Sequence, residues 1–182
     1  QSHFAGPRRP IEELYDCEHD PLNLTNLVNS PKHQKILKRM QKEHLRYSVE
    51  IRDWGYIPEY EAWEMSKGSS GWKVGKSSKV AWEKIIDAAE LVGRAKESKF
   101  VTNLKSDNET IRYWATIGLG AHEKKLSHDS LSALEKALKD SSASVRIEAA
   151  NALIRNGNTE TAITVLIEEL KHKNLIVVTH AA

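Results

Sequence analysis

The chain has 182 residues, and its 27 Lys and Arg against 25 Asp and Glu give a formal net charge of +2 at pH 7. This balance excludes a strong general attraction to nucleic acid or to anionic membranes. The single cysteine excludes an internal disulfide framework, and no apolar run approaches the roughly 18 residues of a membrane span. We therefore expect an ordinary globular chain of one or two domains, with no secretory signal at its first residues.

Residues 1–29 are predicted to form a short strand and loops. Leu14 has charged neighbours, and Tyr15 favours an extended chain. Asp20 and Pro21 predict a turn, because proline fixes φ and the residue before it avoids the helical region. The leucines that follow have little regular structure around them and need a packing partner; they are Leu22, Leu24 and Leu27.

This N-terminal stretch resembles the C-terminal signature of the sulfatase family, in particular bacterial members of the heparan N-sulfatase type. The residues that carry the resemblance are Glu13, Leu14, Tyr15, Asp16, Asp20, Pro21, Asn26 and Leu27. Cys17 departs from the pattern, where an aliphatic residue is more usual, although a free cysteine behaves as a small hydrophobe. The resemblance covers about residues 8–60 and implies the tail of a hydrolase of sulfuric esters or sulfamates on glycans, in the periplasm or secreted.

An amphipathic helix is predicted over residues 30–54. Ser30 is a suitable N-cap and proline follows at the first helical position, while Gly55 is the expected stop. We expect its apolar face, including a buried His44, to recur at three- and four-residue steps through Ile36, Leu37, Met40, His44, Tyr47, Ile51 and Trp54. The opposite face is basic, which is typical of a solvated helix surface.

Residues 61–78 are predicted to be a connector between two domains. The stretch is rich in glycine and serine, and Trp72 is expected to hold it against a neighbouring helix. The tryptophans as a group allow two interpretations. Exposed rings beside Lys and Arg could stack on sugars or bases, but Trp54, Trp82 and Trp114 fall near helix positions that favour core packing.

A repeat occupies the C-terminal half. Ile111 is followed by an arginine and then by Ala115, and the same pattern returns 34 residues later at Val145 and Ala149. A third copy begins at Leu170 and stops within its second helix. The predicted pairs of antiparallel helices span 99–104 with 111–120, 131–139 with 145–156, and 161–171 with 176 onward.

The repeats resemble HEAT-type repeats, whose turn carries an aspartate and whose second helix opens with V-R-x-x-A. We expect a structural row of caps in which each arginine reaches the turn of the preceding repeat; its members are Asp107, Arg112, Asp140 and Arg146. In the third copy Val178 replaces the arginine and Asn174 the aspartate, so the row is expected to be weaker there.

Catalytic chemistry is not expected in this chain. A sulfatase needs a cysteine or serine in a C/S-x-P-x-R setting, and Ala5 stands where the spacing would place it. Neither the histidines nor the carboxylates have a spacing that indicates a metal site or an acid–base pair. Calcium and formylglycine are therefore implied only for a missing catalytic domain. Arg8 and Arg9 are the residues expected to face its anionic substrate.

The fold class predicted is mainly α, with a strand-and-loop N-terminal piece, a long helix and an α–α superhelix. We divide it into a sulfatase tail at 1–60, a linker at 61–78 and repeats at 79–182, the last one incomplete. The first functional hypothesis is a non-catalytic fragment of a sulfatase-like hydrolase that packs on its own catalytic domain and offers the repeats to a protein partner or a second copy. The alternatives are a stand-alone repeat scaffold and, less favoured, a module that binds nucleic acid through the basic face of helix 30–54.

Overall fold

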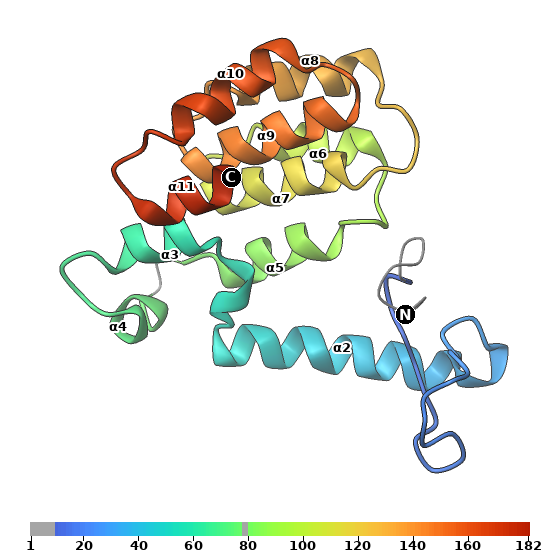
Figure 1. Ribbon diagram of the computed structural model, residues 1–182. Coiled ribbons are helices and arrows are strands. Elements are labelled where there is room, and N and C mark those ends of the chain that lie inside the picture. The colour runs from blue at the N-terminus through green and yellow to red at the C-terminus, as the bar shows by residue number, and fades with distance from the viewer. Residues whose placement is uncertain (1–9, 78–79) are drawn as a thin grey trace. The chain divides into compact units, whose positions relative to one another are not determined.

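The computed structural model describes residues 10–77 and 80–182, and 61% of these described residues are helical, with no strand among them. This confirms the mainly-α class. The chain divides into two compact units, the first ending at Glu50 and the second running from Ile51 to Ala182 (Figure 1). Within the described ranges, no helix has both the length and the apolar character needed to cross a membrane.

The first unit opens with a braced loop instead of the predicted strand around Leu14. Leu14 is only 8% exposed, its N–H donates to the side-chain oxygen of Asn26 at 3.0 Å, and its carbonyl accepts from the N–H of Leu27 at 2.7 Å. A side-chain amide thus takes the place of one backbone partner, and no ladder forms. Leu22 and Leu24, which we expected to need a packing partner, are 76% and 73% exposed.

The long helix is shorter than predicted at both ends. A 3₁₀ turn at Pro31–His33 precedes α2 (Gln34–Ile51), and Ser30 makes no cap hydrogen bond to a backbone N–H. The helix ends before Gly55, because Arg52 adopts a left-handed φ of 57°. His44 is exposed, which contradicts the expected burial.

The apolar stripe of α2 is largely uncovered within the first unit. Ile36, Met40 and Tyr47 are 42%, 53% and 55% exposed, and Ser48 is the buried residue of this helix. The loop is tied to the helix by a polar contact instead, in which the amide of Gln41 donates to the carboxylate of Glu12 at 2.8 and 2.9 Å. The stripe was predicted correctly, but its burial was not.

The second unit begins with short helices where a connector was predicted. A 3₁₀ turn at Trp54–Tyr56 is followed by α3 (Glu59–Ser66), α4 (Gly71–Gly75) and α5 (Trp82–Glu90). The linker assigned to 61–78 is therefore mostly α3 and α4, and residues 51–60 belong to the same compact body as these helices.

The tryptophans separate into two groups in this part of the fold. Trp82 is buried and meets Trp54 edge-to-face at 5.7 Å, while Trp114 donates from its ring N–H to the carbonyl of Tyr56 at 2.8 Å. Core packing is therefore their role. Trp63 and Trp72 are 45% and 69% exposed, so Trp72 does not hold its segment against a neighbouring helix.

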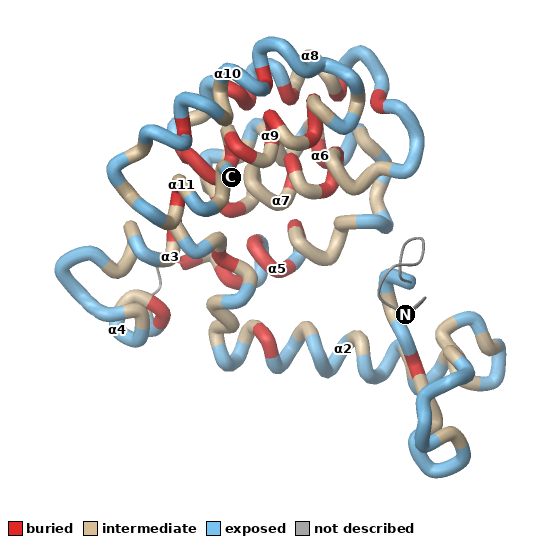
Figure 2. Tube along the Cα trace, viewed as in Figure 1, coloured by how far each residue is buried: buried red, intermediate tan, exposed pale blue. Residues whose placement is uncertain are grey.

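Three helical hairpins complete the second unit, as predicted. They are α6 (Glu97–Asn103) with α7 (Glu109–Gly120), α8 (His128–Ala137) with α9 (Ala143–Arg155), and α10 (Glu160–Glu169) with α11 (Leu175–Ala181). The second helices of successive hairpins lie side by side, α7 against α9 (Figure 1). Buried positions concentrate on the faces of α9 that meet its neighbours (Figure 2).

Sequence explains how closely these helices pack. Ala149, Ala150 and Ala152 on α9 are buried to 1% exposure or less, and small side chains let helix axes approach. Gly118 on α7 has a similar role, because a Cβ there would lie 2.2 Å from the ring of Phe100. Alanine at this position would therefore displace the aromatic side chain that fills the first hairpin.

Candidate functional site

The turns of the hairpins are linked by a row of charged side chains, which we call the turn ladder: Arg112, Asp140, Arg146 and Glu169. Arg112 binds the Asp140 carboxylate in a bidentate manner, Nε to Oδ2 at 2.7 Å and Nη2 to Oδ1 at 2.8 Å. Its Nη1 also donates to the carbonyls of Ser106 and Asp107 at 2.8 and 3.0 Å. One arginine therefore closes its own turn and reaches the next.

Arg146 repeats this arrangement one hairpin later. Its Nη1 donates to the carbonyls of Asp140 and Ser141 at 2.7 and 3.1 Å, and its Nε donates to the Glu169 carboxylate at 2.5 Å. Each arginine thus reaches forward to the following repeat, whereas the sequence pattern predicted the preceding one. Asp107, which was expected to belong to this row, contributes only its backbone carbonyl. The sequence pattern did not indicate Glu169, because this residue lies on the first helix of its hairpin, outside the turn motif.

The contact between Arg112 and Asp140 shifts the pKa values of both side chains. Burial alone would raise the pKa of Asp140, but hydrogen bonds from Arg112 and from the N–H of Ser142 outweigh it, so the pKa lies below the usual 3.8. The hydrogen bond to Asp140 correspondingly raises the pKa of Arg112. Both side chains are 12–13% exposed, so water screens the pair only weakly.

The third turn is built differently. His172 occupies the place of Asp140, since its Nδ1 accepts from the N–H of Asn174 at 3.0 Å as the Asp140 carboxylate accepts from Ser142 at 2.8 Å. Asn174 is the N-cap of α11 and so corresponds to Ser142, which corrects the expectation that it replaces the aspartate. With Val178 in the arginine position, the ladder stops at this turn.

Helix α3 contacts both α9 and α11. Its Glu61 is only 4% exposed, and the carboxylate accepts from the hydroxyls of Ser142 and Ser144 at 2.5 and 2.7 Å. A carboxylate is favourable beside the positive end of a helix. Sequence reasoning missed Glu61, because its partners lie 81 and 83 residues further along the chain and no local motif indicates them.

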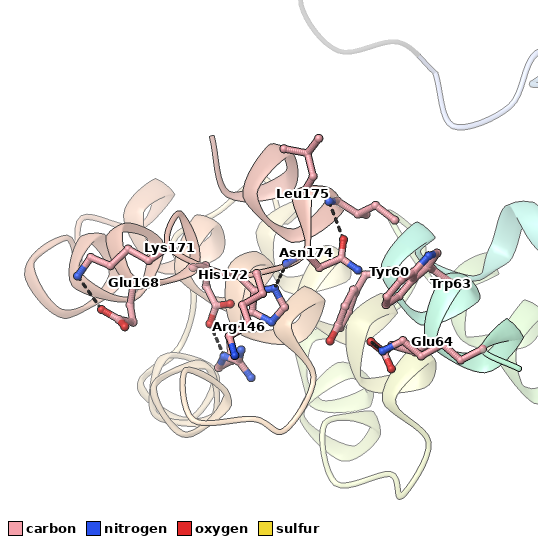
Figure 3. Close-up of a pocket in the computed structure, with 13 residues that line it drawn as sticks. Tyr60, Trp63, Glu64, Arg146, Glu168, Lys171, His172, Asn174 and Leu175 are labelled. Carbon is pink, nitrogen blue, oxygen red and sulfur yellow. Dashed lines mark hydrogen bonds and ion pairs between the residues drawn. The ribbon is translucent and has the colours of Figure 1, made fainter.

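A groove of about 850 Å³ opens between α3 and the turn that joins α10 to α11 (Figure 3). We call it the Trp63 groove; residues that line it include Tyr60, Trp63, Glu64, Lys67, Arg146, Glu168, Glu169, Lys171, His172, Lys173 and Asn174. Tyr60 meets His172 edge-to-face at 5.7 Å, and the Lys67 ammonium lies 4.1 Å from the centre of the Trp63 ring. Aromatic and charged groups thus share one wall.

Charges in the Trp63 groove are arranged as adjacent pairs. Lys67 binds Glu64 at 2.6 Å and Lys171 binds Glu168 at 2.9 Å, both near the solvent, while Arg146 binds the buried Glu169. The Lys67 hydrogen bond lowers the pKa of Glu64, and burial together with Glu64 raises the pKa of Tyr60. Glu64 is therefore ionised at neutral pH, and the Tyr60 hydroxyl keeps its proton there.

The sulfatase-like signature lies in the first unit and braces its loop. The Asp20 carboxylate accepts from the N–H groups of Leu24 and Thr25 at 3.1 and 2.8 Å, and Asp16 accepts from the N–H groups of Glu18 and His19 at 3.2 and 3.3 Å. Asn26 accepts from the N–H of Leu14 in the same way. In this structure, Asp16, Asp20 and Asn26 of the signature therefore hold the shape of the loop. Arg8 and Arg9 lie outside the described residues.

The chain resembles known proteins in two respects. Residues 97–182, from the start of α6 to the end of the chain, match the family described as HEAT repeats. Over 109 residues the chain is 33% identical to an ulvan-active sulfatase of Formosa agariphila, which is 58% of this chain and 18% of that relative. The chain therefore spans about a fifth of the relative's length. No solved structure matches it.

Among the described residues, no group of three or more His, Cys, Asp or Glu is placed to hold a metal ion.

The turn ladder, the paired helices and the family match agree with one another along the second unit. We conclude that residues 97–182 form HEAT-like helical hairpins of an α superhelix.

Proposed function

We propose that this chain is the non-catalytic, helical-repeat part of a sulfatase-like hydrolase that acts on sulfated glycans. The observation that carries the proposal is the 33% identity to the ulvan-active sulfatase. The hydrolysed bond in the whole protein would be a sulfuric ester or, as in the heparan N-sulfatase type that the signature resembles, a sulfamate. The whole protein would work in the periplasm or outside the cell, with calcium and formylglycine in its catalytic domain.

The first unit supports an attachment role. The side chains of Asp20 and Asn26 accept hydrogen bonds from backbone N–H groups of their own loop, which favours a structural role for these two signature residues. The exposed stripe of Ile36, Met40 and Tyr47 would be removed from water if α2 lay on a catalytic domain. We therefore assign α2 and the braced loop to the interface with that domain.

The second unit would then serve as an interaction surface. HEAT-like repeats bury their apolar faces against neighbours and leave an extended surface for binding. The outer side of α10 carries Ile163, Ile167 and Leu170 at 45%, 51% and 43% exposure, spaced to lie along one helix face. This observation favours the second candidate function, a scaffold that binds a protein or a second copy of the chain.

The reading frame of the gene separates the two functions. For the sulfatase proposal we expect a C/S-x-P-x-R sequence and a cluster of acidic metal ligands in the same open reading frame, upstream of the first unit. A start codon directly before the first unit, with no such sequence upstream, would contradict the proposal and leave the scaffold. DNA sequencing of the locus and mass measurement of the natural protein provide the result.

A further inference from the structure

We infer that the Trp63 groove is a binding site for a short stretch of a sulfated saccharide chain. The inference rests on the proposed function for the class of ligand, and on the composition of the groove for its location. The site lies within the second unit, where the loop after α10 faces α3 (Figure 3).

The aromatic wall supplies the first requirement of such a site. Trp63 is nearly half exposed, and Tyr60 beside it is fixed in orientation by its edge-to-face contact with His172. A flat aromatic side chain with one solvent-exposed face can stack on the apolar face of a pyranose ring, and it loses little rotamer freedom on binding. Trp54 packs edge-to-face on Trp82, and Trp114 donates to the carbonyl of Tyr56. Trp63 is instead 45% exposed, so core packing does not account for its position.

The charged groups supply the second requirement. Lys67, Lys171 and Lys173 bring three ammonium groups to the groove, and the first two lie beside the carboxylates of Glu64 and Glu168. Sulfate groups pair with the ammonium groups, and the neighbouring carboxylates accept hydrogen bonds from sugar hydroxyls. Because the lysine–glutamate pairs are exposed, opening one of them to admit a sulfate costs little.

This mixture of charges distinguishes a sulfated saccharide from nucleic acid. A continuous row of phosphates would meet Glu64, Glu168 and Glu169 as well as the lysines, and like charges at close range are unfavourable. A sulfated saccharide alternates anionic groups with hydroxyls, which fits alternating lysines and glutamates. The volume of about 850 Å³ lies within the usual range for a small-ligand site, so the groove suits a few sugar rings.

The chain contains a matched control for this site. On α4, Trp72 is 69% exposed and the Lys76 ammonium lies 3.8 Å from the centre of its ring, so the same residues recur at the same spacing as Trp63 and Lys67. Neither Trp72 nor Lys76 is among the residues that line the Trp63 groove. A variant of each pair therefore separates the groove from a general effect of exposed tryptophan and lysine.

The test compares W63A/K67A with W72A/K76A and the unaltered chain, using a fluorescently labelled heparin-like octasaccharide and its desulfated counterpart in fluorescence anisotropy. We expect W63A/K67A to raise the Kd by about tenfold and W72A/K76A to leave it within about twofold, since stacking and charge contacts of this kind are each worth up to about a tenfold change. The desulfated octasaccharide should bind more weakly than the sulfated one, and far-UV circular dichroism confirms that both variants remain folded.

Equal effects of the two variants, or no effect of either, would overturn the groove as the site. Absence of binding by the unaltered chain would overturn the inference as a whole, and the reading frame of the gene would still decide the proposed function on its own. Tighter binding of a duplex DNA of equal charge, with a steep salt dependence, would also overturn it, because the site would then read phosphate charge alone.

Discussion

The second and third hairpins have the same plan and different turns. Around α8 and α9 the turn holds Asp140, whose carbonyl accepts from Arg146 of the same hairpin, and Leu138 beside it is 5% exposed. Around α10 and α11 the same places hold His172 and Leu170, the latter 43% exposed. The comparison shows that a turn is closed by the arginine of its own second helix. At the third turn valine takes that position, at Val178, and residues 171–176 of this turn line the Trp63 groove.

The largest expected difference between the two hairpins concerns their equivalent leucines. Leu138→Ala should lower the free energy of unfolding by about 3 kcal/mol, because it leaves a cavity in a packed core. Leu170→Ala should lower it by less than about 1 kcal/mol, because much of that side chain is already in water. Urea denaturation measures both. Equal losses would mean that α10 is covered in solution, for example by a second copy.

Removal of the ladder arginine should have the next largest effect. Arg112→Ala deprives Asp140 of two charge-assisted hydrogen bonds and leaves two turn carbonyls without this donor, so we expect a loss of about 2 kcal/mol. Lys171→Ala is the control, since it breaks an exposed pair and should cost less than about 0.5 kcal/mol. If both variants unfold at the same urea concentration, the ladder has no energetic role.

The pH dependence of that loss follows from the lowered pKa of Asp140. A carboxyl whose pKa is lower in the folded state adds stability above its unfolded pKa, and this contribution disappears as the pH falls through the folded value. The difference between the wild type and Arg112→Ala should therefore be constant above roughly pH 5 and should shrink below 3.8. Denaturant titrations from neutral to acidic pH give the curve. A difference that grows on acidification would contradict this origin.

The smallest effect should come from making the third turn resemble the second. His172→Asp places a carboxylate at the start of α11, near Arg146, and should raise stability by about 0.5 kcal/mol at neutral pH. It also removes the ring that supports Tyr60, so binding of the heparin-like octasaccharide should weaken in the same variant. Thermal unfolding and anisotropy are measured on one preparation. Higher stability with unchanged binding would show that His172 serves the turn alone.

Several features could be predicted because their causes are local in sequence. The 34-residue recurrence of Ile111 and Val145 placed the hairpins, and the structure brings Arg112 and Asp140, both named from the sequence, into contact. The direction in which the arginines reach could not be predicted, because it depends on the stacking of one hairpin on the next. Likewise the amphipathic stripe of α2 follows from residue spacing, while its exposure depends on the packing around it.

The helical repeats follow from local sequence, since each turn carries its own caps and each helix its own apolar period. The site depends on how distant segments fold together. Glu61 is buried because folding brings it to Ser142 and Ser144, and the Trp63 groove exists because α3 lies beside a turn roughly a hundred residues further along the chain. Local patterns specify elements through short-range hydrogen bonds and spacing. Grooves arise from contacts between distant segments, which no local pattern contains.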